Sequence, residues 1–188
     1  MQNNISEDLE NIEHNVNPVS IQLLFDEVNN EVAREICAWI LNANFAQYKP
    51  EALHLIINSP GGDLNAAYAI IDVMKSSAIP VNTVGVGQIQ SAGLMIFMAG
   101  QKGQRILTPN TTIMSHQYSW SASGKHNELI AIRKEFDLSY HRMMQHYMSH
   151  TTLTEDDVKK YLLPSEDCYL SSEEALELGI CDKIAFLT

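Results

Sequence analysis

Segments with the periodicity of β-strands alternate with segments of helical periodicity along most of the chain. The strand patterns cover residues 19–23, 53–58, 81–87, 105–107, 112–116 and 180–187. The helical patterns cover residues 29–42, 63–77, 91–99 and 124–150. The first strand pattern, in which Val19, Ile21 and Leu23 alternate with polar residues, is typical of a half-buried strand. Alternation of this kind predicts an α/β fold, and no internal repeat or low-complexity stretch divides it.

The length and apolar content of the chain predict a single domain. Its 188 residues, 45% of them apolar, are sufficient to bury one sizeable core. We expect this domain to cover residues 18–188. The acidic arm at residues 1–17 carries apolar residues at helical spacing, so it is either a short amphipathic helix or a disordered segment. Capping-box patterns at residues 154–157 and 171–174 predict two further short helices.

Charge and cysteine content exclude several classes of function. The formal net charge is −11, which argues against a nucleic-acid partner because phosphate binding needs clustered cations. The three cysteines, Cys37, Cys168 and Cys181, are widely spaced, so they predict neither a disulfide framework nor a zinc site. The sequence has no membrane-length apolar run and no secretory signal at its start. We therefore expect a cytoplasmic protein that does not contact membranes.

The junction between the 81–87 strand and the 91–99 helix carries a candidate nucleophile. Ser91 stands there, where a sharp turn can present its hydroxyl and where the first helical N–H groups can face an anion. A serine at a helix start is more often only an N-cap. The Ser-Pro-Gly-Gly turn at residues 59–62 offers further backbone amides, although its plainer interpretation is a tight turn.

Serine catalysis also needs a base on the hydroxyl and a carboxylate on that base. His116 ends an apolar strand, where a lone histidine is more often a structural hydrogen-bonding residue. Asp167 is distinguished from the surrounding acids only by the apolar pair that follows it. His146 and His150 have the spacing of a metal pair on a helix, but no third ligand is near in sequence. We therefore predict that these two histidines are surface residues and that the chain binds no metal.

Four ordered motifs give the chain a resemblance to a known family. They are INSPGGD at 57–63, GQIQSAG at 87–93, AGQKGQRILTPNTTIMSHQ at 99–117 and DCYLSSEEALELGICDKI at 167–184. Together they resemble the proteolytic subunit of the Clp protease, the ClpP family, over roughly residues 50–188, with serine, histidine and aspartate in the family's order. The resemblance implies an ATP-dependent Clp-type serine endopeptidase.

The resemblance assigns a role to each candidate residue. It implies that Ser91 is the nucleophile, His116 the general base and Asp167 the acid that orients the histidine. The backbone N–H groups of Gly62 and Ala92 would form the oxyanion hole. No cofactor is implied in this chain, since the ATP would be consumed by a partner unfoldase and no phosphate-binding loop is present.

The resemblance also implies a fold and an assembly. The fold would be a ClpP/crotonase-like α/β core of repeated β-β-α units, with a protruding handle helix at about residues 124–150. The handle would interlock two heptameric rings into a tetradecamer, and residues 1–17 would form an axial loop or a short helix. Unfolded polypeptides delivered by an AAA+ unfoldase would be degraded inside the resulting chamber.

Two alternatives remain beside an active endopeptidase. Where the family usually has a small residue, a methionine and a proline, this sequence has Gln90, Ala92 and Tyr118, so the pocket around the serine differs. Cys168 replaces a basic residue that the family commonly has after the aspartate. The first alternative is a catalytically weak or regulatory subunit that assembles with an active partner. The second is a crotonase-type acyl-CoA enzyme, which shares the core and an amide oxyanion hole.

Overall fold

A mostly parallel β-sheet forms the centre of the molecule. The computed structural model describes residues 20–119 and 121–186, so the predicted arm at 1–17 and Val19 lie outside the described residues. In this part of the chain, five parallel strands run in the order β1-β2-β3-β4-β7. Their bounds are Ile21–Leu24 for β1, Leu53–Ser59 for β2, Val81–Gln90 for β3, Arg105–Leu107 for β4 and Lys183–Ile184 for β7. The predicted α/β fold is confirmed.

Two further strands branch from the long central strand β3. The register of β3 shifts against β2 near its end, and the far half of β3 pairs in parallel with β5 (Thr112–Ser115). β5 pairs in turn with the antiparallel strand β6 (Cys168–Leu170). The β3–β5 pairing is important because it brings the ends of two parallel strands to the same edge.

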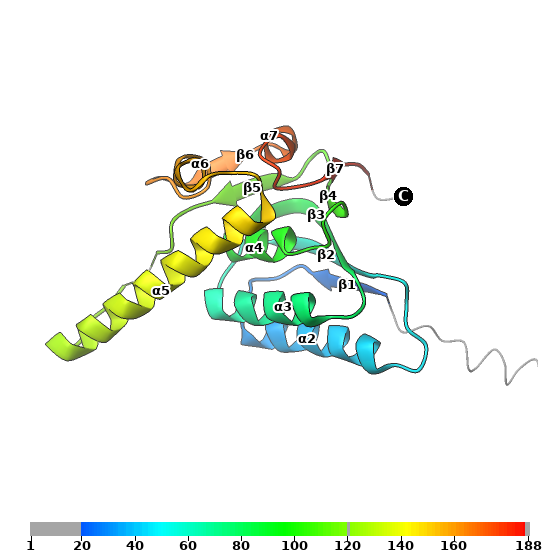
Figure 1. Cartoon of the computed structure of the whole chain (residues 1–188), viewed down its shortest axis with the longest axis horizontal. Helices are drawn as coiled ribbons and strands as arrows, with labels where there is room; N and C mark the ends of the chain where they lie inside the picture. Colours follow the sequence, from blue (N-terminus) through cyan, green and yellow to red (C-terminus); the bar gives the residue numbers. More distant parts are fainter. Residues whose placement is uncertain (1–19, 120, 187–188) are drawn as a thin grey trace, which may run out of the picture.

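Three helices lie side by side along the strands, as Figure 1 shows. They are α2 (Asn30–Phe45), α3 (Leu64–Ser76) and α4 (Ala92–Met98). The Asn29 side chain caps α2, and the Asp63 carboxylate caps α3 by accepting from the Ala66 N–H at 2.6 Å. Each residue of α4 is buried, which confirms the sequence prediction of a helix inside the core.

Two short helices belong to the C-terminal part of the chain, one in contact with α5 and the other in contact with β5 and β6. They are α6 (Glu155–Tyr161) and α7 (Ser172–Glu177), and each begins with a complete capping box. Both capping boxes match the predicted patterns at residues 154–157 and 171–174. Reciprocal side-chain and backbone hydrogen bonds satisfy amides that a short helix would otherwise leave unpaired.

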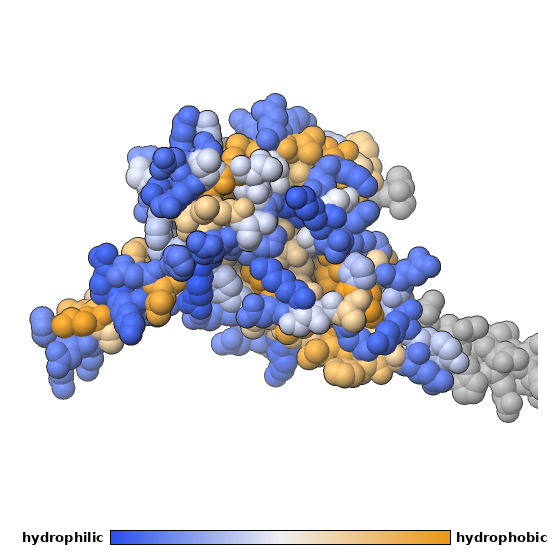
Figure 2. Space-filling model, in the orientation of Figure 1, coloured by the Kyte–Doolittle hydropathy of each residue, from blue (hydrophilic) through white to orange (hydrophobic). Residues whose placement is uncertain are grey.

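The longest helix, α5 (His126–His150), projects from the body of the molecule (Figure 1). Its buried residues all lie in its second half, from Ser139 onward. The first half exposes Leu129, Ile130 and Leu138, and apolar surface appears near the projecting end in Figure 2. The predicted protruding helix at 124–150 is confirmed, with a start two residues later. No helix in the described ranges is both long and apolar enough to cross a membrane.

Strand β1 differs from the half-buried strand expected from the alternation of Ile21 and Leu23. Both side chains are about half exposed, whereas Leu24 is buried. The pairing with β2 explains this orientation, because Leu24 lies opposite the buried Ile57 and Ile21 lies opposite His54. The sequence prediction was therefore wrong about β1, since it took the exposed face of this strand for the face that packs into the core. The strand expected at 180–187 was also too long, since the described part contains only Lys183–Ile184.

Candidate active site

Ser91 occupies a strained turn between β3 and α4. Its backbone has φ 50° and ψ −120°, and it is the one non-glycine residue with positive φ among those that the structure describes. Such a conformation is unfavourable for a residue with a side chain and persists only where the surroundings enforce it. The Ser91 N–H donates to the Met114 carbonyl on β5 at 2.9 Å, and the side chain makes no capping bond to α4. The plainer interpretation as an N-cap is therefore not what the structure contains.

Gly61 lies directly against this turn. It has φ +95°, and a Cβ at this position would come within 2.8 Å of both the Ser91 Cβ and the Gln90 carbonyl oxygen. Ser59 holds the loop in place, since its Oγ accepts from the Gly61 N–H at 3.2 Å and donates to the Asp26 carbonyl at 2.7 Å. The Ser-Pro-Gly-Gly turn is thus packed against Ser91. The sequence predicted the turn but not the contact between Gly61 and Ser91. The only sequence feature that pointed to so close an approach is the Gly-Gly pair.

Two backbone amides beside Ser91 are available to a ligand. Within the described residues, the N–H groups of Gly62 and Ala92 donate to no acceptor in the chain. Ala92 is the first residue of α4, where the helix dipole adds a partial positive charge. A Cβ on Gly61 would lie 3.1 Å from the Ala92 nitrogen, which shows how closely the loop approaches this amide. The predicted oxyanion donors thus lie at neighbouring turns, and their role stays a prediction.

His116 meets Ser91 across the paired ends of β3 and β5. The pairing of Gln90 with Met114 brings these ends together, and the His116 Nε2 lies 2.7 Å from the Ser91 Oγ. With its proton on Nδ1, the neutral ring can accept the hydroxyl proton at this distance. The structure therefore joins the two residues that the sequence selected as nucleophile and base.

Asp167 is near His116 in the backbone but is not bonded to it. Ser115 pairs with Cys168 across the antiparallel β5–β6 ladder, so the next step in this register places Asp167 opposite His116. The Asp167 side chain is exposed, and within residues 20–119 and 121–186 it makes no hydrogen bond to the imidazole. Its orienting role stays a prediction.

The segment after His116 offers an open backbone edge. The backbone groups of residues 117–119 form no hydrogen bond with another described part of the chain. The Gln117 side chain donates to the Leu163 carbonyl at 3.0 Å, and the Tyr118 ring stacks on Phe136 of α5 with centroids 6.1 Å apart. This stacking was not predicted, because nothing in the sequence links the two aromatic residues.

His146 corrects the prediction of a surface histidine pair. Its side chain is buried, and its Nε2 lies 2.9 Å from the Met95 carbonyl oxygen of α4. The second half of α5 packs against α4, so this helix face lies inside although it carries an ionisable residue. The ring of His150 lies beside that of His146, with centroids 4.2 Å apart. The described residues contain no cluster of three or more His, Cys, Asp or Glu side chains suited to a metal ion.

The fold and the serine–histidine pair define an α/β protein with a site of the hydrolase type. The family model described as Clp protease matches residues 6–187. The chain is also 33% identical over 157 residues to the ATP-dependent Clp protease proteolytic subunit of Deinococcus radiodurans, covering 84% of this chain and 76% of that protein. The chain therefore belongs to the Clp protease family and is a ClpP-type peptidase, which disfavours the acyl-CoA enzyme alternative.

Proposed function

We propose that this chain is a serine endopeptidase that cleaves polypeptides through an acyl-enzyme formed on Ser91. The observation that carries the proposal is the 2.7 Å contact between the Ser91 Oγ and the His116 Nε2. A serine hydroxyl is a weak nucleophile at neutral pH and needs an adjacent base. The Ser91 side chain makes no capping bond to α4, so no such bond competes with the contact to His116.

The proposed reaction needs only groups of this chain and water. His116 accepts the Ser91 proton as Oγ attacks the peptide carbonyl, and it then donates that proton to the leaving amine. The Gly62 and Ala92 amides would stabilise the negative charge on the carbonyl oxygen. Water, deprotonated by His116, then hydrolyses the ester and releases the acid product. Asp167 would hold the imidazole in the required tautomer.

An extended, unfolded polypeptide is the substrate that best fits the proposed site. The free backbone groups after His116 can pair with a peptide backbone, and such pairing depends little on side-chain identity. We further propose that the chain assembles in the cytoplasm into two stacked heptameric rings, a tetradecamer that encloses the site. An AAA+ unfoldase would supply substrate with ATP, in keeping with the name of the Deinococcus relative.

One observation favours a second candidate, a catalytically weak or regulatory subunit. Asp167 is exposed and, in the described part of the chain, does not bond to His116. A histidine without its carboxylate partner is poorly oriented for proton transfer. In a mixed assembly, such a subunit would contribute architecture while an active partner performed the cleavage.

Labelling with a fluorophosphonate probe tests the proposed chemistry directly. We expect an adduct on Ser91, located by mass spectrometry of the digested protein. Ser91→Ala should abolish labelling and reduce peptide hydrolysis by about 10⁶-fold while leaving assembly unchanged. An assembled wild-type protein that forms no adduct would contradict the active-peptidase proposal and favour the regulatory subunit.

A further inference from the structure

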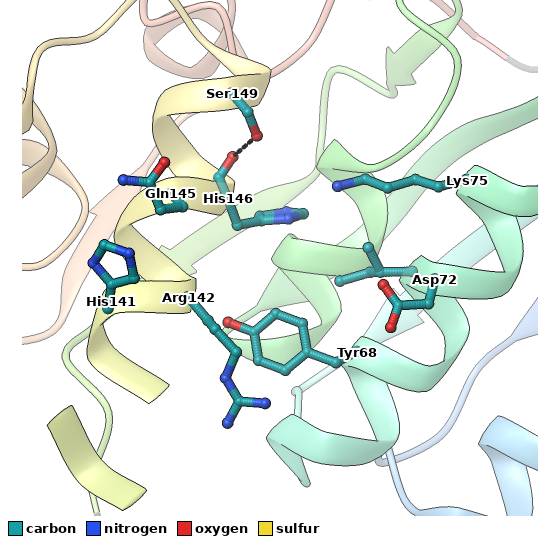
Figure 3. A pocket seen from close by; sticks show the side chains of 9 residues that line it. Tyr68, Asp72, Lys75, His141, Arg142, Gln145, His146 and Ser149 are labelled. Carbon is teal, nitrogen blue, oxygen red and sulfur yellow. Dashed lines mark hydrogen bonds between the residues drawn. The ribbon is translucent and has the colours of Figure 1, made fainter. Parts of the chain in front are cut away.

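A pocket lies between α3 and α5 on the body of the molecule, and it contains neither Ser91 nor His116. Its volume is about 370 Å³. Figure 3 shows Lys75 of α3 directed toward the His146 ring of α5, with His141 five residues earlier on the same helix. Most of the lining side chains are exposed and charged or polar, whereas His146 is buried. The pocket therefore opens a route for small solutes to a ring that is otherwise inside the core.

Two hydrogen bonds connect His146 to the nucleophile. The Met95 carbonyl oxygen can only accept, so the Nε2–H of His146 donates to it at 2.9 Å. The Met95 N–H donates in turn to the Ser91 carbonyl oxygen at 3.2 Å. The projecting helix α5 is thus joined through one turn of α4 to the main chain of the catalytic serine.

The surroundings keep this histidine neutral. Burial lowers the pKa of His146 to about 3, and the nearby His150 and Lys75 add to this effect. A neutral ring with its proton on Nε2 remains a donor to Met95 throughout the neutral range. Burying a polar ring costs free energy unless the ring is hydrogen-bonded. The hydrogen bond to α4 therefore explains why the His146 ring can lie in the core.

We propose that His146 is a positioning residue that holds the first turn of α4, and with it the strained Ser91, in the conformation that reacts. The proposal rests on the serine mechanism above, and it adds a contact between α5 and the nucleophile that does not involve substrate. Ser91 needs such support because its positive φ is unfavourable by itself.

His146→Leu tests the proposal, with His141→Leu as the matched control. We expect the rate of fluorophosphonate labelling and kcat to fall about fivefold in His146→Leu, with KM unchanged, because one neutral hydrogen bond is lost. Hydrogen–deuterium exchange of the α4 amides should become faster. His141→Leu changes the same helix and pocket, and the His141 side chain makes no hydrogen bond within the described residues, so both readouts should stay at wild-type values.

Chemical rescue separates the hydrogen bond from general packing. Imidazole should restore labelling in His146→Ala because it carries an N–H donor and can enter through the pocket, whereas N-methylimidazole should not. If His146→Ala does not assemble, His146→Gln replaces it, and its amide donor should preserve more activity than leucine does.

Two outcomes would overturn the proposal. The first is a His146→Leu variant in which the rate of labelling and the exchange of the α4 amides both equal those of the wild type. The second is equal rescue of His146→Ala by imidazole and N-methylimidazole. Exchange of the α4 amides does not depend on the reactivity of Ser91. A wild-type protein that cannot be labelled would therefore contradict the serine mechanism, while the exchange comparison would still decide whether His146 holds α4.

Discussion

At the residue scale, the site depends on how the strained backbone of Ser91 is held. A non-glycine residue in such a conformation costs about 1–3 kcal/mol, which the surroundings must offset. The bond from the Ser91 N–H to Met114 fixes one side of the turn, and the Gly61 loop packs against the other. The hydroxyl is therefore placed by the backbone and not by side-chain rotation alone.

Asp167→Asn tests whether the carboxylate acts on His116 in the assembled protein. If it does, kcat on a fluorogenic peptide should fall by about 10⁴-fold, because an amide favours the wrong imidazole tautomer. Glu166→Gln removes the neighbouring exposed acid and should leave kcat unchanged. A fully active Asp167→Asn protein would show that His116 works without this residue.

The sequence predicted Ser91 and His116 more securely than the other site residues. Both stand at the ends of predicted strands, but the sequence did not predict that these strands pair in parallel, and only the family resemblance implied that the two side chains meet. Asp167 had no predicted strand beside it, because β6, the strand that it precedes, was not predicted. His146 was wrongly assigned to the surface, because its i, i+4 spacing with His150 fits both a metal pair and an exposed helix face.

At the element scale, α5 combines two halves of different character. The second half packs against α4 and buries residues such as Met143 and Tyr147, while the first half contributes no buried residue. This division could not be inferred from apolar spacing, which continues through both halves of the helix. The face of β1 was similarly ambiguous, because consecutive Leu23 and Leu24 satisfy either orientation and only the pairing with β2 decides between them.

The lowered pKa of His146 predicts that the free energy of unfolding falls in mild acid. Its pKa of about 3 in the folded protein lies below the unfolded value of 6.5, so the unfolded state binds more protons between these values. Its contribution is therefore complete above pH 6.5 and is lost as pH falls toward 3, at up to about 1.4 kcal/mol per pH unit. The groups that face the ring, Lys75 and His150, oppose its protonation, and Arg105 acts in the same way on His150.

Urea unfolding between pH 4 and pH 7 measures this effect. The free energy of unfolding of His146→Leu should depend less steeply on pH than that of the wild type, and His141→Leu should keep the wild-type slope. Parallel slopes for wild type and His146→Leu would contradict the assignment of the acid sensitivity to this ring.

At the scale of the whole molecule, the projecting half of α5 presents apolar side chains that are exposed in the described part of the chain. Ile130 is 58% exposed and Leu138 is 53% exposed. Apolar side chains on a projecting helix gain free energy when a second subunit buries them. This surface is consistent with the proposed contact between rings.

Ile130→Asp should weaken the association of rings. Losing one buried isoleucine side chain and placing a charge at the contact should raise the dissociation constant about tenfold or more. Sedimentation velocity should then show more of the smaller species at a given concentration. Asn127→Asp adds the same charge on the same half of the helix and should leave the distribution unchanged. Identical profiles for the two variants would contradict a contact at Ile130.

The packing of Gly61 against the serine turn also has an evolutionary consequence. The space for a side chain is closed by the Gln90 carbonyl and the Ala92 nitrogen as well as by Ser91 itself. A descendant that replaced the serine and lost catalysis would therefore still need glycine at this position to fold. This glycine would therefore persist after the activity was lost, so finding it in a diverged relative is evidence of common architecture before it is evidence of proteolysis.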